Sequence, residues 1–246
     1  ANRRSSPVQA VRTAITLLGL KRVASIAVGV ACRSLFDVEV RVQHELLPGW
    51  WERLFHCAMT EAFAASFVAM EHNRAASDGI FLAAMLHDIG KSLALRSLAA
   101  LTISGQVQAL PEDETIEELL RRLRVPVGVA ALTALNMPEN LVVLCGHQDD
   151  EDLPETKEWT DVHVVRLVSA LNDLRLATLN TEQPIRFLLG AVRSMHLSPD
   201  AVVAIARQVS EHAAQVGLLF STTDGAEEIG YLDFVARCVQ QANEKS

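Results

Sequence analysis

Apolar residues recur at intervals of three and four positions along most of this chain, which is the spacing of helices that bury one face. No stretch alternates apolar and polar residues with a period of two, as half-buried strands do. The sequence therefore predicts an all-α fold with no sheet. The expected helices cover about residues 7–18, 21–36, 50–71, 80–88, 112–123, 126–136, 138–147, 160–179, 184–195, 199–220 and 226–242.

Glycine and proline punctuate this pattern. Gly90 follows a dense apolar run and is expected to end that helix in the left-handed conformation that glycine adopts easily. Pro126 is expected to begin a new helix, because proline fits the first helical position.

Composition limits the class of protein. The chain has 246 residues, half of them apolar, which is enough for one large domain or two small ones. It carries 22 basic and 30 acidic residues, and the basic ones are scattered, which disfavours a nucleic-acid partner. The longest nearly uncharged run, residues 23–32, is too short to span a bilayer, and no signal peptide is evident. We expect no membrane association.

The cysteines are far apart and show no CxxC spacing: they are Cys32, Cys57, Cys145 and Cys238. Buried, reduced thiols in a cytoplasmic protein are expected from this placement.

The strongest chemical signal is the doublet His87-Asp88, which closes the apolar run that begins at Ile80. Burying an imidazole and a carboxylate costs several kcal/mol unless each finds a partner, so a metal, a hydrogen-bond network or mutual pairing is required. A His-Asp doublet alone is more often a hydrogen-bonded pair at a helix end than a metal site. His56, on a predicted core-facing stripe, is by itself also more often a core residue than a ligand.

Three segments in this order resemble the HDOD branch of the HD superfamily of metal-dependent phosphohydrolases. They are Ala14-Ile15-Thr16-Leu17-Leu18-Gly19, the run that contains His87-Asp88-Ile89-Gly90-Lys91, and Met137-Pro138-Glu139-Asn140-Leu141 leading to His147. The resemblance covers roughly residues 1–195 and implies an orthogonal bundle of helices like that of HD domains. It divides the chain into an HDOD-like domain, 1–197, and a helical extension packed on it, 198–246. It also places residues 2–6 near the middle of the family's domain, so we expect helices upstream of this sequence.

The resemblance implies a divalent metal held by His56, His87 and Asp88, with His147 as a further ligand. Iron, manganese, zinc or magnesium would suit such mixed imidazole and carboxylate donors. In an active enzyme Lys91 would offset the charge of a bound phosphate.

Three departures from the family pattern weaken the catalytic interpretation. Ser169 stands where a late aspartate is expected, although Asp173 lies one turn further on. Arg124 replaces a histidine, and its cation would repel a second metal. The His-His pair of relatives is His147-Gln148 here.

The sequence therefore predicts a regulatory, non-catalytic signalling domain with a degenerate metal site that holds one divalent ion or none. The alternative is a metal-dependent phosphohydrolase acting on a nucleotide or a phosphomonoester. The resemblance implies protein partners such as response-regulator receivers or cyclic-dinucleotide enzyme domains.

Three other features can be interpreted either structurally or functionally. The arginines 121, 122 and 124 are expected to be a solvated helix end rather than a phosphate site. The run 148–152 is expected to be a solvated acidic loop rather than a carboxylate metal site. In the C-terminal extension a stripe indicates either a dimer interface or packing against the main domain: Val202, Ile205, Val209, His212 and Val216.

Overall fold

The computed structural model describes residues 16, 19–36, 45–72, 79–150, 152–156, 159–176, 181–222 and 230–243. The described residues form helices joined by turns and contain no strand, which confirms the all-α prediction. None of these helices is long and apolar enough to cross a membrane. The helices are α2 (Leu20–Phe36), α4 (Trp50–Glu71), α5 (Ile80–Leu86), α6 (Ile89–Ile103), α7 (Asp113–Ala134), α8 (Glu139–His147), α9 (Thr160–Arg175), α10 (Glu182–Ser194), α11 (Pro199–Phe220) and α12 (Tyr231–Asn243).

Local signals account for two of the longest helices. The ranges of α4 and α11 coincide with the predicted ones, 50–71 and 199–220. At the start of α11 the hydroxyl of Ser198 accepts a hydrogen bond from the backbone amide of Ala201 at 3.3 Å, and Pro199 follows at the first position. The predicted helix at 7–18 falls almost entirely outside the described residues.

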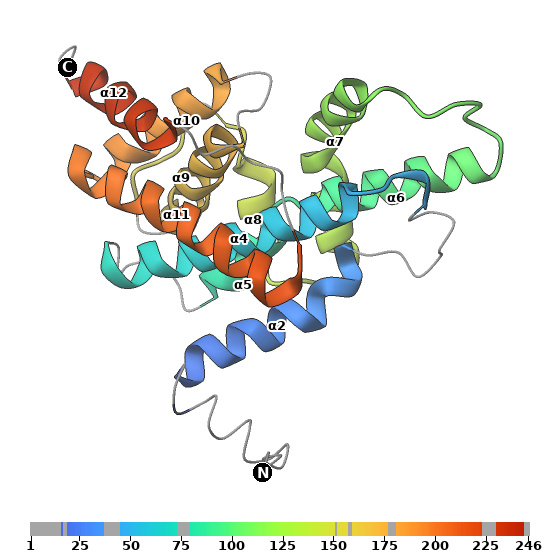
Figure 1. The fold of residues 1–246 in the computed structure, drawn as a ribbon, viewed down its shortest axis with the longest axis horizontal. Helices are drawn as coiled ribbons and strands as arrows, with labels where there is room; N and C mark the ends of the chain where they lie inside the picture. The colour runs from blue at the N-terminus through green and yellow to red at the C-terminus, as the bar shows by residue number, and fades with distance from the viewer. Residues whose placement is uncertain are drawn as a thin grey trace, which may run out of the picture.

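Two apolar cores organise the bundle, and α4 contributes to both. The larger core gathers residues of α4, α5, α8, α9, α10, α11 and α12, and the smaller one joins α6 and α7 to the beginning of α4. Figure 1 shows this division, with α6 and α7 together on the right and α9 to α12 on the left. The segment between α5 and α6, which carries the His-Asp doublet, therefore lies where the two cores meet.

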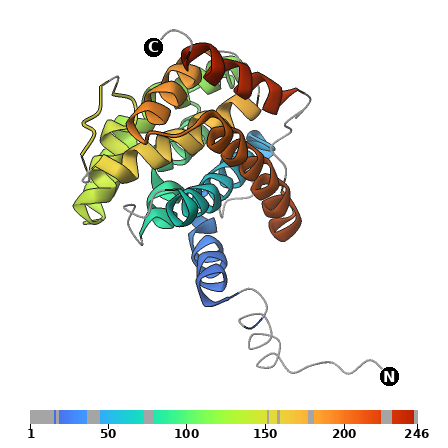
Figure 2. The ribbon, with the colours of Figure 1, turned by 90° about the vertical axis from the view of Figure 1, so that its left-hand side faces the viewer.

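The C-terminal helices pack on the main bundle. All five residues of the α11 stripe are at most 8% exposed. Phe220 of α11 meets Phe55 of α4 edge to face, with 5.2 Å between ring centroids. Figure 2 shows α11 and α12 along one side of the molecule. Packing within the chain thus accounts for the stripe, while the domain boundary at 197/198 and the oligomeric state stay predictions.

Gly90 does not end a helix, so that prediction was wrong. It lies inside α6, where α6 crosses α7 at very close range. A Cβ atom at Gly90 would come within 1.9 Å of the carbonyl oxygen of Arg124 and 2.7 Å of the backbone nitrogen of Gly128. The glycine is required here for close backbone approach rather than for a left-handed turn.

Pro126 does not begin a new helix either, because α7 runs through it without interruption. Proline removes one backbone donor and leaves the carbonyl four residues earlier, that of Arg122, without its helical partner. Pro126 and Arg122 are both exposed, so water can hydrate that carbonyl. Solvent on this side of α7 is what makes the interior proline tolerable.

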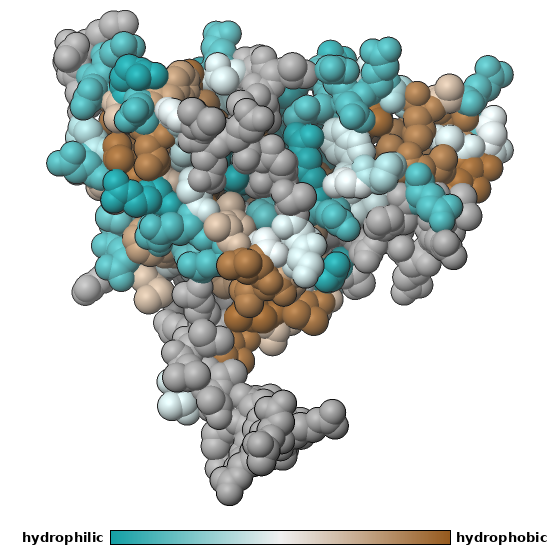
Figure 3. Space-filling view, viewed as in Figure 1, coloured by the Kyte–Doolittle hydropathy of each residue, from teal (hydrophilic) through white to brown (hydrophobic). Residues whose placement is uncertain are grey.

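Apolar side chains are exposed where the end of α11 lies beside α2. Val30 is 58% exposed, Leu218 86% and Leu219 51%. A Cβ atom at Gly29 of α2 would lie 3.7 Å from the ring of Phe220, which places the end of α11 close to α2. Figure 3 shows a continuous hydrophobic area on this part of the surface.

Candidate functional site

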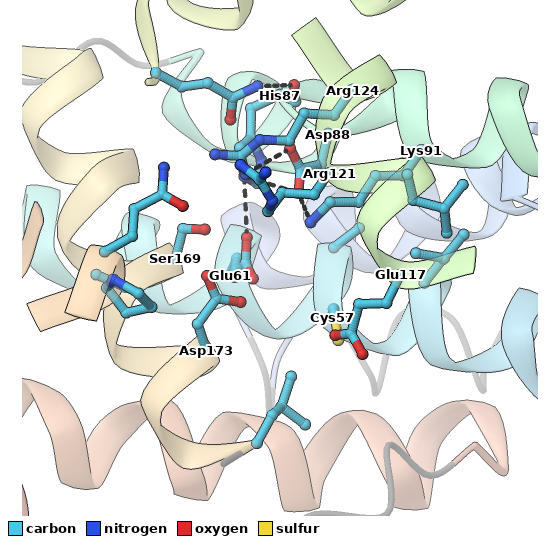
Figure 4. A pocket seen from close by; sticks show the side chains of 18 of the residues that line it. Cys57, Glu61, His87, Asp88, Lys91, Glu117, Arg121, Arg124, Ser169 and Asp173 are labelled. Atoms are coloured by element: carbon cyan, nitrogen blue, oxygen red, sulfur yellow. Dashed lines mark hydrogen bonds and ion pairs between the residues drawn. The ribbon is translucent and has the colours of Figure 1, made fainter. Parts of the chain in front are cut away.

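The doublet forms the joint between two helices. Helix α5 ends at Leu86 and α6 begins at Ile89, so His87 and Asp88 are the linking residues. Asp88 stands at the N-cap of α6, but its side chain makes no capping hydrogen bond. The carboxylate points instead toward α7, as Figure 4 shows.

Two cations hold the carboxylate of Asp88. The ammonium of Lys91, one turn along α6, pairs with Oδ2, and Nη1 of Arg124 on α7 lies 3.4 Å from Oδ1. Burial alone would raise the pKa of Asp88, but the cations Lys91 and Arg124 hold that pKa well below its usual range. Asp88 is therefore ionised and already neutralised by side chains of the protein.

His87 is a neutral, buried imidazole. Its Nδ1 lies 2.7 Å from the carbonyl oxygen of Ala84, and because a carbonyl only accepts, Nδ1 carries the proton. Nε2 can then only accept, and it lies 3.3 Å from Oε2 of Glu61 on α4 without a hydrogen-bond partner among the described residues. Burial lowers the pKa of His87, although the neighbouring Asp88 acts in the opposite direction.

Glu61 completes this arrangement, and the sequence reasoning missed it. Burial and the carboxylates of Asp173 and Asp88 raise the pKa of Glu61 to about 8. The protonated carboxyl therefore predominates at neutral pH, beside the unpartnered Nε2 of His87. Asn172 of α9 donates to the other oxygen of Glu61 at 2.8 Å. The only sequence signal was an acidic residue inside the apolar run of residues 58–65.

The other two predicted ligands, His56 and His147, lie apart from the doublet. Nδ1 of His56 lies 3.0 Å from the hydroxyl of Thr222, against the end of α11. Nδ1 of His147 lies 2.7 Å from Oδ2 of Asp150, and its ring meets Trp159 edge to face. Neither lines the cavity beside His87 and Asp88. The structure thus brings together two of the four predicted ligands, and their metal role stays a prediction.

The arginine cluster is not a uniformly solvated helix end, because α7 continues ten residues past Arg124, to Ala134. Arg124 is 7% exposed and binds Asp149 through Nε and Nη2 in addition to Asp88. The acidic run is only partly a solvated loop. Gln148 is buried and donates to the backbone carbonyl of His87 at 3.1 Å. Both segments therefore help to build the site.

A cavity of about 510 Å³ opens beside the doublet, between α4, α6, α7, α9 and α10. Ser169 and Asp173 of α9 line it opposite Lys91 and Arg124, and Glu61 stands between the two sides (Figure 4). Burial raises the pKa of Asp173, while Lys91 and Arg124 act against this. Ser169 thus occupies the place in which the family resemblance expects a metal-binding aspartate.

The side chains gathered here make a poor donor set for a divalent cation. Asp88 already has two cationic partners, and a metal ion would be repelled by both. Among the described residues, no three His, Cys, Asp or Glu side chains are arranged to hold a metal ion. The chemistry that this arrangement does offer is a neutral imidazole-carboxyl pair beside a charge-balanced carboxylate.

Glu61→Gln is expected to change the pH dependence of stability. The carboxyl has a pKa of about 8 when folded and about 4.3 in an unfolded chain. Between these values the folded state retains a proton that the unfolded state has lost, so wild-type stability falls as pH rises. The amide removes this dependence. From about pH 6 to pH 7 the free energy of unfolding of Glu61→Gln should gain about 1 kcal/mol relative to wild type.

Urea unfolding at a series of pH values checks this expectation. The matched control is Glu114→Gln, because Glu114 is exposed on α7. Parallel pH profiles for wild type and Glu61→Gln would show that Glu61 is ionised in the folded protein at neutral pH.

Comparison with known protein families shows the family of this chain. The model of the HDOD domain family, which belongs to the HD-like superfamily, matches residues 1–151. No curated protein and no solved structure matches the chain. The matched region contains the doublet and both of its cationic partners, Lys91 and Arg124. On this match over more than half of its length, the chain belongs to the HDOD domain family.

Proposed function

We propose that this chain is a regulatory signal-transduction domain of the HDOD type that does not catalyse phosphoester hydrolysis. One observation carries the proposal: Lys91 and Arg124 neutralise Asp88 from two different helices. In a metal-dependent hydrolase the aspartate of the doublet would be needed to neutralise the metal. Here the protein supplies its own cations at that position.

The residues around the doublet support the same conclusion. Lys91, the one predicted catalytic side chain, is engaged by Asp88 and so is not available to offset the charge of a substrate. Ser169 offers a neutral hydroxyl, which is a weak ligand for a hard cation. Glu61, whose carboxyl is protonated at neutral pH, lies 3.3 Å from Nε2 of His87 and brings no negative charge for a metal. The cluster then serves to lock α4, α6 and α7 together.

Family membership is the support for a signalling role. We propose that the domain acts on partner proteins in the cytoplasm, such as receiver domains or cyclic-dinucleotide enzymes, and that nucleic acid and membranes are not its partners. The negative formal charge of −8 fits partners other than nucleic acid. A homodimer is compatible with this role.

The alternative is a metal-dependent phosphohydrolase acting on a nucleotide or a phosphomonoester. What favours it is Asp173, which lines the same cavity as His87 and Asp88 and could supply a third donor. It would require Asp88 to exchange a protein cation for the metal.

Metal analysis and a phosphoesterase assay separate the two functions. We expect the purified protein to contain well under one equivalent of iron, manganese, zinc or magnesium, and to hydrolyse no generic phosphomonoester above background. The double variant Arg124→His, Ser169→Asp restores the ligand types of the family. Its metal content is the reference with which that of the wild type is compared. A full equivalent of metal together with turnover that disappears in His87→Ala and in Asp88→Ala would establish the hydrolase instead.

A further inference from the structure

The cavity beside the doublet is large enough for a small molecule. Its volume, about 510 Å³, lies within the usual range for ligand pockets. Two aromatic side chains line it, Trp50 of α4 and Phe187 of α10, and most of the other lining side chains are polar. The chemistry of that lining indicates what the cavity accepts.

Most of the cations around the cavity already have carboxylate partners. Arg121 pairs with Glu118, and Arg53 pairs with Glu117 at 3.2 Å. Lys91 and Arg124 are held by Asp88, and Arg124 also by Asp149. The wall formed by α4, α6 and α7 is thus close to charge balance.

Arg166 on α9 differs from these cations. It lines the cavity, is 7% exposed, and its guanidinium lies 4.2 Å from the centroid of the Phe187 ring. Its Nε atom is buried and has no hydrogen-bond partner in the described part of the chain. Burial lowers the pKa of Arg166, with Asp149 and Asp150 acting in the opposite direction. The guanidinium nevertheless stays charged at neutral pH.

A buried guanidinium without an adequate counter-ion is unfavourable, and a bound anion removes that cost. Arginine is well suited to oxyanions because its planar fork donates two parallel hydrogen bonds to a phosphate or a carboxylate. The contact with Phe187 restricts the guanidinium and so reduces the entropy lost on binding.

The neighbouring side chains add uncharged hydrogen-bonding groups. Ser169 follows Arg166 by three positions on α9, so both lie on the face of the helix that lines the cavity. Gln183 of α10 also lines the cavity. A hydroxyl and a primary amide suit the hydroxyl groups of a polar ligand.

We propose that this cavity binds a small hydroxylated molecule through an oxyanion, a phosphate or a carboxylate that pairs with Arg166, and that such a molecule is the input of the domain. The input role rests on the proposed regulatory function. Binding of the molecule in the cavity does not rest on that function.

The test compares anion-dependent stabilisation in wild type, Arg166→Met and Arg207→Met, using inorganic phosphate and acetate as probes and chloride at equal ionic strength as the reference. Arg207 is an exposed arginine of α11, so its substitution matches the change in net charge. Thermal unfolding is followed at increasing probe concentration, and calorimetry gives the dissociation constant.

For wild type and Arg207→Met we expect the melting temperature to rise with phosphate, acetate or both, beyond the effect of chloride. In Arg166→Met the dissociation constant should weaken by about tenfold or more, as loss of a charge-assisted hydrogen bond predicts. Without anion, Arg166→Met should be at least as stable as wild type, because methionine removes an unpaired buried charge while keeping the apolar contact with Phe187. A structural arginine would instead lose stability on substitution.

Either of two results would overturn the inference: no anion-specific stabilisation of wild type, or equal stabilisation of wild type and Arg166→Met. Each of these results can be told apart from a result that refutes the proposed regulatory function. Metal-dependent turnover would refute the regulatory role while leaving Arg166 as an anion ligand. Absence of metal and turnover with unchanged binding in Arg166→Met would refute only the ligand site.

Discussion

Gly90→Ala is expected to destabilise the fold by about 3 kcal/mol or more, although it adds a single methyl group. The new Cβ would lie 1.9 Å from the carbonyl oxygen of Arg124 and 2.8 Å from its carbonyl carbon. Both atoms belong to the backbone of α7, so no side-chain rotation relieves the overlap. Helix α6 must instead move away from α7, which also separates Asp88 from Arg124.

Urea unfolding followed by circular dichroism measures this loss, with Gly190→Ala as the matched control. Gly190 lies inside α10, and a Cβ there would meet nothing within 4 Å. Alanine should stabilise that helix by about 0.5–1 kcal/mol. If the two variants behaved alike, the close crossing of α6 and α7 would not exist in solution.

Helix positions were predictable wherever a single local signal was decisive. Periodic apolar residues predicted the range of α11, and in the structure Pro199 and the cap Ser198 mark its start. The same reasoning failed at Gly90 and Pro126, where the local sequence favours a break. In both places the outcome depends on what lies beside the helix, the backbone of α7 in one case and water in the other. No local pattern contains that information.

The site was predictable only in part for the same reason. The doublet could be identified because a polar pair at the end of an apolar run has to be compensated. Its partners come from residues that are distant in the chain: Glu61 is 26 positions before His87, and Arg124 is 36 positions after Asp88. The sequence indicated that Arg124 replaces a histidine, but it did not indicate that the guanidinium would bind Asp88 directly.

Arg124→Met is the second substitution with a large expected effect, about 3 kcal/mol at neutral pH. Methionine keeps the helix propensity and much of the volume of arginine, so the loss reports mainly on charge. Asp88 would retain Lys91 but lose Nη1 of Arg124 at 3.4 Å, and Asp149 would lose its guanidinium partner. Removing one member of a buried ion pair commonly costs about 3–5 kcal/mol.

The effect should depend on pH in a definite direction. Because the folded pKa of Asp88 lies below that of an unfolded aspartate, its contribution to stability is present above about pH 4 and is lost as the pH falls further. The difference between wild type and Arg124→Met should therefore be largest near neutral pH and shrink in acid. Arg121→Met is the control, since Arg121 makes an exposed pair with Glu118 and should cost less than about 1 kcal/mol. Equal losses in the two variants, or a difference that does not change with pH, would mean that Arg124 does not neutralise Asp88, and the main support for a non-catalytic site would be gone.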